Sequence, residues 1–400
     1  MPDEYDLIII GAGPAGSSCA EAAAASGLRV RVFERARFPR TKPCAAGLTS
    51  HALELLGDRA EGVIHRRIDT VEMRLTPRVR GTWHGTHTVV ATTTRRELDP
   101  LLAKRASEAG ATVDFGRCVT GIGTARAGVV VTSRDERFTA PFAVLAEGAK
   151  GVLRSRLGMP PLELGGAAYV RLYPAWGGGT DSDIGGLGGA IVLDARARRC
   201  GYGWVFPKRD HVNVGVCGRE RPGPDYLRDL TSLVASLGLT SWRREGPFAG
   251  FVPRASHPED HAHSRVLAVG DAAGLADPVT GEGIGHAVES GRIAAATVAE
   301  ALSASRAAMA GGACREVEAD GTADAGGATD VAGRYRARIA REVMPRLTLL
   351  GPIGRRLHAV GPGLIGALLT VRPLASAVER WVPTSGYTAG GRLTIETGRR

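Results

Sequence analysis

The stretch that decides the fold reads Tyr5-Asp6-Leu7-Ile8-Ile9-Ile10-Gly11-Ala12-Gly13-Pro14-Ala15-Gly16. Its apolar half is typical of a buried parallel strand, and a glycine-rich half follows at once. An alanine-rich helix is expected to run to Ser26, and a second strand is expected from Leu28 to Glu34. A GxGxxG turn between a strand and a helix, with an acid 23 residues after Gly11, predicts a dinucleotide-binding Rossmann unit.

This turn suggests roles for its residues. The Gly11, Gly13, Ala15 and Gly16 positions would allow a tight turn and let a pyrophosphate approach the helix N-terminus, while Glu34 could bind two ribose hydroxyls. NAD and FAD share this fingerprint, so the turn alone does not choose between them. A second match, Gly361-Pro362-Gly363-Leu364-Ile365-Gly366, has no convincing strand before it and is interpreted as a bend between helices.

A second strand-to-helix motif lies about 250 residues further along. The apolar strand Val266-Leu267-Ala268-Val269 ends in Gly270-Asp271, and Gly281-Glu282-Gly283-Ile284 then leads into a helix expected to reach about Ala301. This segment resembles the GD motif of FAD-dependent oxidoreductases with the para-hydroxybenzoate-hydroxylase-like fold. The resemblance implies that Asp271 holds the ribityl hydroxyls of FAD and that the helix N-terminus points at the flavin, where its partial positive charge would stabilise an anionic reduced ring.

Three further matches narrow the family. They are the loop Thr41-Lys42-Pro43-Cys44-Ala45-Ala46-Gly47-Leu48, the strand Gly201-Tyr202-Gly203-Trp204-Val205-Phe206-Pro207-Lys208, and Arg95 at the start of a helix. Together they resemble the geranylgeranyl reductase family, whose usual forms are a KxCGGGL-like loop and a YxWxFP strand. The resemblance covers roughly residues 3 to 300.

The resemblance implies a reaction and a set of site residues. Family members reduce isolated carbon–carbon double bonds of prenyl chains with reduced flavin, which requires a dry apolar slot. Cys44 matches the family's proposed catalytic cysteine, and Tyr202, Trp204 and Phe206 share one strand face that can wall the slot. The remaining positions assigned to the cofactor are Arg35, Ala45, Ala46, Gly47, Arg95, Val119, Gly270, Asp271, Gly281, Gly283 and Ile284.

Two segments depart from the family pattern. Ala45 and Ala46 stand where glycines are usual, which adds methyl groups where backbone should approach the flavin ring. The motif usually written DGxxS reads Glu147-Gly148-Ala149-Lys150-Gly151. A glutamate keeps the charge but reaches further, so these changes concern cofactor geometry and substrate identity.

Composition limits the classes of protein. The 400 residues are 44% hydrophobic and 23% charged, and no window approaches the ~20 apolar residues of a spanning helix. The net charge is 51 − 41 = +10, and twelve arginines against three glutamates fall after residue 330. No nucleic-acid motif accompanies them. Peripheral contact with an anionic membrane surface, through Arg346, Arg355, Arg356 and Arg372, competes with a merely arginine-rich composition.

The cysteines and histidines predict no metal site. Six cysteines form no CxxC pair, and the absence of a signal peptide favours the cytoplasm, with a possible peripheral position at the inner face of the membrane. Histidines 257, 261 and 263 are read as a solvated loop.

The organisation follows from these motifs. We expect a mixed α/β fold with a discontinuous Rossmann-type FAD-binding domain (3–75, 95–160 and 262–303) and an interleaved β-rich substrate domain (76–94 and 161–261). A flexible linker (305–330), rich in Ala, Gly and Asp, would lead to a basic helical C-terminal region (331–400).

Three functions compete at this point. The first is an FAD-dependent prenyl reductase acting on a lipid, a quinone tail or a phytyl precursor. The second is an aromatic monooxygenase or halogenase of the same fold, although a halogenase should carry WxWxIP and a hydroxylase an intact DG motif. The third is a prenyl-binding module without enzymatic activity. The electron donor (NAD(P)H, a ferredoxin or a quinol) and the oligomeric state are not specified by the sequence.

Overall fold

The structure is a computed structural model. It describes residues 5–125, 128–174, 189–253, 256–277, 280–310, 330–348 and 391–397. Within these ranges the strands form four sheets.

A six-stranded sheet carries the glycine-rich turn. Its strand order is β18-β19-β12-β1-β2-β8, and β1 runs parallel to both β2 and β12. The strands are β1 (Leu7–Ile10), β2 (Val30–Glu34), β8 (Thr112–Phe115), β12 (Phe142–Leu145), β18 (Ala262–His263) and β19 (Val266–Ala268). The central strands β1 and β12 are buried along their whole length, as expected of parallel strands covered on both faces. The predicted strands before Gly11 and Gly270 are therefore confirmed.

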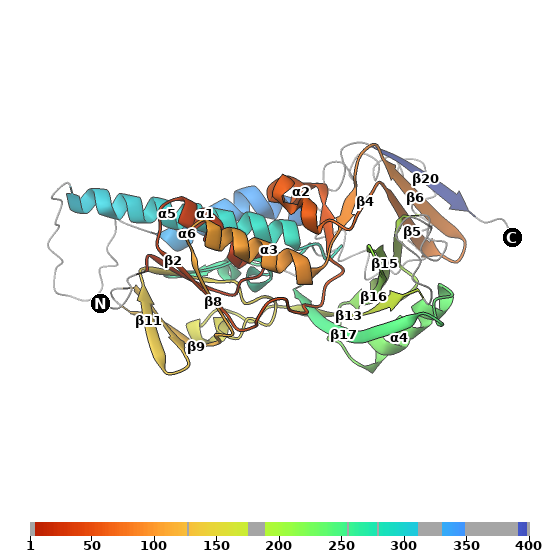
Figure 1. Cartoon of the computed structure of the whole chain (residues 1–400), viewed down its shortest axis with the longest axis horizontal. Coiled ribbons are helices and arrows are strands. Elements are labelled where there is room, and N and C mark those ends of the chain that lie inside the picture. The colour runs from red at the N-terminus through yellow and green to blue at the C-terminus, as the bar shows by residue number, and fades with distance from the viewer. Residues whose placement is uncertain are drawn as a thin grey trace.

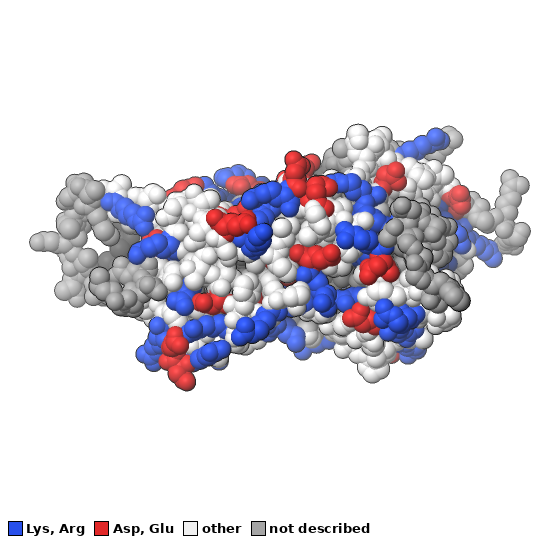
Figure 2. All heavy atoms as spheres, in the orientation of Figure 1, with Lys and Arg blue, Asp and Glu red and all other residues white. Residues whose placement is uncertain are grey.

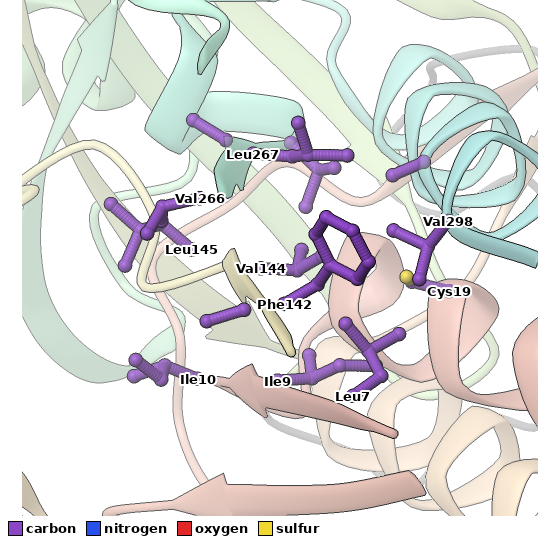
Figure 3. Close-up of a cluster of buried hydrophobic side chains, with 14 of the residues drawn as sticks. Leu7, Ile9, Ile10, Cys19, Phe142, Val144, Leu145, Val266, Leu267 and Val298 are labelled. Atoms are coloured by element: carbon purple, nitrogen blue, oxygen red, sulfur yellow. The ribbon is translucent and has the colours of Figure 1, made fainter. Parts of the chain in front are cut away.

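Helices pack against this sheet. They are α1 (Pro14–Ala25), α3 (Arg95–Glu108) and α5 (Ile284–Ala310), and α1 contacts both of the others as well as β1 and β2 (Figure 1). Figure 3 shows the resulting core, in which Phe142 of β12 and Val298 of α5 surround the Cys19 thiol of α1. Burial raises the pKa of Cys19 to about 12, so this cysteine is a packing residue.

Two small sheets complete this half of the molecule. The sheet β11-β10-β9 comprises Val119–Ala125 (β9), Gly128–Ser133 (β10) and Glu136–Ala140 (β11), and it adds Ile122, Val129 and Val131 to the same core. The sheet β3-β7-β4 comprises Gly47–Thr49 (β3), Arg66–Ile68 (β4) and Val90–Thr92 (β7). The short helix α2 (Ser50–Leu56) follows β3 and contacts α5.

An eight-stranded sheet forms the other half of the molecule, at the right of Figure 1. Its order is β17-β13-β16-β15-β14-β5-β6-β20. The strands are β5 (Thr70–Thr76), β6 (Val79–Gly85), β13 (Leu164–Tyr173), β14 (Ile191–Asp194), β15 (Gly201–Pro207), β16 (Val212–Gly218), β17 (Arg243–Pro253) and β20 (Gly391–Thr397). Helix α4 (Pro224–Ser236) buries Tyr226, Leu230 and Leu233 against this sheet.

The predicted mixed α/β fold is confirmed, with corrections to the boundaries. The boundary at residue 75 is wrong for β5, which begins at Thr70 and pairs with β6 and β14. The segment from Gly391 to Thr397 is not helical but is the edge strand β20, paired with β6. Helix α5 continues to Ala310, into the expected linker, and residues 311–329 lie outside the described ranges.

The region after residue 330 is described only in part. Helices α6 (Val331–Arg338) and α7 (Met344–Thr348) flank a π-helical turn, and residues 349–390, with the second GxGxxG match, lie outside the described ranges. Arg346, one of the arginines expected at a membrane surface, pairs with Glu289 of α5 at 2.6 Å, and Arg355, Arg356 and Arg372 lie outside the described ranges. Figure 2 shows basic and acidic side chains interspersed over the visible face. Within the described residues, no helix combines the length and apolar character that crossing a membrane requires.

Candidate active site

A cavity of about 910 Å³ is enclosed jointly by residues of the six-stranded and eight-stranded sheets and the loops beside them. Its polar half is lined by the turn between β1 and α1, the end of β2, and the turn before α5, whereas its apolar half is lined by β5, β6, β14 and β15. All the site residues expected from the sequence line this cavity except Gly16 and Gly270. The structure therefore brings together motifs that are separated by up to about 250 residues in the chain.

The glycine-rich turn is tight enough to require glycine. Gly11 has a φ of +105°, and a β carbon there would lie 2.4 Å from the carbonyl oxygen of Ala146. A β carbon on Gly16 would lie 1.8 Å from the carbonyl oxygen of Gly11, so Gly16 serves the packing of helix on strand. Gly270 is similar, since its β carbon would meet Ala287 and Ala15 at about 3.0–3.1 Å. Direct cofactor contact by Gly16 and Gly270 is thus not supported.

Two arginines converge beside Gly13. Arg95 donates to both carboxylate oxygens of Asp99, at 2.6 and 2.9 Å, and Arg40 lies 2.9 Å from the same carboxylate. A β carbon on Gly13 would lie 3.6 Å from a guanidinium nitrogen of each arginine. Asp99 is fully buried and supplies one negative charge for two positive ones. Two guanidinium groups next to the N-terminus of α1 suit a pyrophosphate.

The state of Arg40 supports this fit. Its Nε atom is buried and makes no hydrogen bond, although Glu34 lies 4.0 Å away. Burial lowers the pKa of Arg40, and the neighbouring Arg95 adds to the effect while Asp99 opposes it. Such an uncompensated buried donor is expected where an anionic ligand completes the site.

Glu34 lies where a ribose would bind. Its two carboxylate oxygens accept the backbone N–H groups of Ala12 (2.9 Å) and Ala36 (2.8 Å), which fixes the side chain and leaves further lone pairs free. Arg35 and Val119 line the same end of the cavity. The carboxylate of Glu34 is therefore fixed at this end of the cavity, and its contact with a ribose stays a prediction.

The turn before α5 faces the middle of the cavity. Asp271, Gly281, Gly283 and Ile284 line it, and Lys42 lies 3.7 Å from the Asp271 carboxylate. The carboxylate of Glu282 accepts the N–H of Gly285 at 2.7 Å and so caps the first turn of the helix.

Glu282 also pairs with a buried histidine. Nδ1 of His286 lies 3.0 Å from its carboxylate, although this nitrogen has no well-directed hydrogen bond. Burial acts to lower the pKa of His286, but the Glu282 carboxylate outweighs it and the pKa is raised. The pKa of Glu282 is lowered, because His286 and the Gly285 N–H outweigh the effect of burial. The two groups thus favour an ion pair beside the turn.

The departure at Glu147 has a structural role. Its carboxylate accepts the N–H of Leu153 at 3.0 Å and so closes the loop after β12. Burial raises the pKa of Glu147, although the backbone N–H groups of Leu153 and Val152 oppose that effect. The Glu147 carboxylate thus holds the loop after β12.

Cys44 lies on the loop before β3 and lines the cavity, partly exposed. The next residue but one, Ala46, has a φ of +53° and is almost fully buried. The N–H of Ala46 donates to Sγ of Cys44 at 3.3 Å. A short bent loop thus fixes the sulfur of a residue that lines the cavity and also packs against the cluster around Leu48 and Ala52.

The three aromatic residues of β15 all line the cavity but differ in their contacts. The Tyr202 hydroxyl donates to the carbonyl of Thr280 and so links the eight-stranded sheet to the turn before α5. Burial raises the pKa of Tyr202 well above its usual value. The indole N–H of Trp204 donates to Asn213 at 2.8 Å, and Phe206 packs against Gly47. These residues shape the wall and also position the loops around it.

The apolar half of the cavity extends along the eight-stranded sheet. Its lining includes Val71 and Met73 of β5, Trp83 of β6, Leu193 of β14 and Leu393 of β20. The C-terminal strand thus supplies part of the wall. A chain of methyl-branched hydrocarbon could lie here without losing any hydrogen bonds.

Several residues that line the cavity or contact its lining were missed by the sequence analysis. Arg40 and Asn213 belong to no motif quoted above. Lys208 is the last residue of the quoted aromatic segment, but no role was assigned to it. His261 corrects the reading of a solvated loop, since it is buried and hydrogen-bonded to Ser256 at 2.7 Å. No group of three or more His, Cys, Asp or Glu side chains in the described ranges is arranged to hold a metal ion.

The fold and the polar half of the cavity define a dinucleotide-binding flavoprotein. A model of the FAD binding domain family matches residues 4–170. The chain is 30% identical to a menaquinone reductase of Mycobacterium tuberculosis, over 74% of this chain and 76% of the relative. It is 31% identical to digeranylgeranylglycerophospholipid reductase 1 of Methanopyrus kandleri, over 75% of this chain and 81% of the relative.

A solved structure shows the same fold. A geranylgeranyl bacteriochlorophyll reductase-like protein of Thermoplasma acidophilum superposes with a TM-score of 0.77 at 20% identity, covering 96% of this chain and 98% of the other. The chain belongs to the geranylgeranyl reductase family of FAD-dependent oxidoreductases. Its cofactor is FAD, and the groups around Gly13, Glu34 and Asp271 are those that would hold it.

Proposed function

We propose that this protein reduces isolated carbon–carbon double bonds in the prenyl chain of a lipid, quinone or phytyl precursor. The observation that carries the proposal is the cavity itself, where an apolar slot along β5, β6 and β14 runs into the flavin-binding half beside Cys44. Relatives named for menaquinone and for digeranylgeranyl lipids support a prenylated substrate. Peripheral contact with a membrane would give access to such a substrate and belongs to the same proposal.

The residues of this chain have separable tasks in such a reaction. Val71, Met73 and Trp83 would exclude water from the alkene and align it by contact alone. Arg40 and Arg95 would hold the pyrophosphate, and the N-terminus of α5 would face the flavin ring. Bound reduced FAD supplies the hydride for one alkene carbon.

The second alkene carbon needs a proton. Cys44 is the candidate donor: its S–H bond would break as the new C–H bond forms, and solvent would then reprotonate the sulfur. The position of Cys44 on the cavity wall, with Sγ held by the Ala46 N–H, supports this assignment.

The proposal is tested by the reoxidation of the dithionite-reduced protein under anaerobic conditions, followed by flavin absorbance. We expect reoxidation to depend on an added geranylgeranyl lipid and to saturate with its concentration. Reoxidation that ignores several prenyl lipids but is fast with oxygen and an aromatic compound would instead assign the protein as a monooxygenase.

The role of Cys44 is tested by Cys44→Ala. General acid catalysis typically contributes about 10²- to 10⁴-fold, so lipid-dependent reoxidation should slow by at least about 100-fold. Reduction by dithionite should be unchanged, because it does not use the thiol. Cys200→Ala, at a half-buried position outside the cavity lining, is the matched control. Full turnover in Cys44→Ala would remove Cys44 from the mechanism.

A further inference from the structure

Lys208 is a buried charged group for which the proposed reaction has no task so far. It follows β15 directly and is 1% exposed. No carboxylate in the described part of the chain forms an ion pair with it. Its Nζ atom donates instead to two backbone carbonyls, of Ala45 at 2.7 Å and of Ala46 at 3.0 Å. Burial of an ammonium group without an anionic partner costs free energy, so its presence here needs an explanation.

The two carbonyls belong to the loop that carries Cys44. The peptide unit between residues 45 and 46 contains both the Ala45 carbonyl, which accepts from Lys208, and the Ala46 N–H, which donates to Sγ of Cys44. In a trans peptide these two groups point in opposite directions. One rigid unit therefore joins the ammonium to the sulfur, and positive charge at the carbonyl polarises the N–H that faces the thiol.

Lys208 also helps to hold an unfavourable backbone conformation. Ala46 is left-handed, a backbone conformation that is unfavourable for a non-glycine residue. Its carbonyl accepts from Lys208 and from the N–H of Thr93 at 3.0 Å. The Cys44 carbonyl is held separately by Asn213 at 3.3 Å. The loop is thus fastened at three successive carbonyls, two of them through Lys208.

We propose that Lys208 is a positioning residue for Cys44, holding the loop in its bent form and stabilising negative charge on the sulfur through the peptide between residues 45 and 46. The catalytic significance rests on the proposed function, but the contact itself does not. Arginine would keep the charge and the donors, whereas methionine would keep only the length.

The charge of Lys208 should depend on pH in an accessible range. Burial lowers the pKa of Lys208 to about 7, with Arg171 of β13 adding to the effect and Cys44 and Glu97 opposing it. His65 and His211 also face it, and burial lowers the pKa of both, with the charge of Lys208 contributing. Lys208→Arg keeps both histidines and removes only the titration of the ammonium, so it separates a Lys208 transition from theirs.

The test measures alkylation of Cys44 by iodoacetamide in the oxidised FAD-bound protein, with Cys200, which lies outside the cavity lining, as the reference thiol in the same sample. Peptide mass spectrometry gives the two rates between pH 6 and pH 9. In the wild type, the ratio of the Cys44 rate to the Cys200 rate should fall as pH rises through about 7, because the ammonium loses its charge. In Lys208→Met the ratio should be lower by on the order of tenfold at pH 6 and flat with pH.

Two further variants make the result decisive. Lys208→Arg should keep a ratio above that of the wild type at pH values above 7, since a guanidinium does not lose its proton. A fall that both proteins share at higher pH comes from ionisation of the two thiols themselves. Lys104→Met, on an exposed surface of α3, should behave as wild type. An unchanged ratio in a folded, FAD-bound Lys208→Met protein would overturn the proposal. If Lys208→Met does not fold, the comparison of the wild type with Lys208→Arg tests the proposal. A wild-type rate ratio that does not change with pH would contradict the proposal. No prenyl substrate is used, so the outcome is independent of the proposed function.

Discussion

At the polar end of the cavity, the turn from Gly11 to Gly16, Glu34 and Arg95 come from the first hundred residues and form a site that specific polar contacts define. At the apolar end, the wall is assembled from β5, β6, β14 and β20, whose residues span positions 70 to 397 and contribute mostly hydrocarbon surface. At the polar end, removal of one charged side chain should strongly weaken FAD binding. At the apolar end, a shorter side chain should have little effect on turnover, whereas a larger side chain that fills the slot should reduce it.

Arg95→Ala is the sharpest way to break the polar end. It removes one of two guanidinium groups beside Gly13 and leaves Asp99 paired only with Arg40. Loss of one partner from a buried charged site is strongly destabilising, so the Kd for FAD should rise about 100-fold or more. Flavin fluorescence titration measures this, with the exposed neighbour Arg96→Ala as control. Equal affinity in Arg95→Ala would mean that the pyrophosphate lies elsewhere.

Leu193→Trp is the corresponding change at the apolar end. The larger ring would occupy the slot beside Met73 and Trp204, its neighbours on adjacent strands. Overpacking of this kind costs about 1–3 kcal/mol, so lipid-dependent reoxidation should fall on the order of 30-fold. The Kd for FAD should stay within about twofold, which separates the two ends. Parallel loss of FAD binding would show that they are not independent, and the exposed His84→Trp on β6 is the control.

Leu393→Ala sharpens the comparison, because it tests whether the C-terminal strand belongs to the apolar end. Leu393 is 8% exposed and packs in one cluster with Val71 and Trp83. Shortening it widens the slot without blocking it, so we expect KM for a prenyl lipid to rise about threefold with FAD affinity unchanged. Arg392→Ala, which is exposed, should have no effect. An unchanged KM in Leu393→Ala would place the prenyl chain away from β20.

The smallest expected effect concerns the boundary between the two ends. The pKa of His286 is raised by Glu282 above its unfolded value, so the pair contributes stability that is present below about pH 6.5 and is lost as pH rises through the folded pKa. Thermal unfolding of His286→Gln should therefore show a Tm deficit of about 2 °C at pH 6 that shrinks by pH 9. The exposed His84→Gln variant should show no Tm deficit. A Tm deficit of His286→Gln that grows with pH would contradict the expected stabilisation by the ion pair.

The polar end could be predicted from the sequence because each of its motifs is short and sits on a strand-to-helix turn. Gly13, Glu34 and Asp271 could be identified without coordinates for this reason. The apolar end could not, since β20 joins the sheet from 300 residues away and its pairing with β6 leaves no local pattern. Lys208 was missed for a related reason, because its role depends on hydrogen bonds to two backbone carbonyls on a loop about 160 residues earlier in the chain.

The polar and apolar ends of the cavity serve one reaction only if a prenyl chain lies against the flavin between them. The most direct measurement is mass spectrometry of a geranylgeranyl lipid after one anaerobic turnover with the reduced protein. The account predicts a product that has gained two hydrogens for each bond reduced, with a matching amount of oxidised flavin. Unchanged lipid beside flavin that stays reduced, together with an oxygenated or halogenated aromatic product once air is admitted, would contradict it.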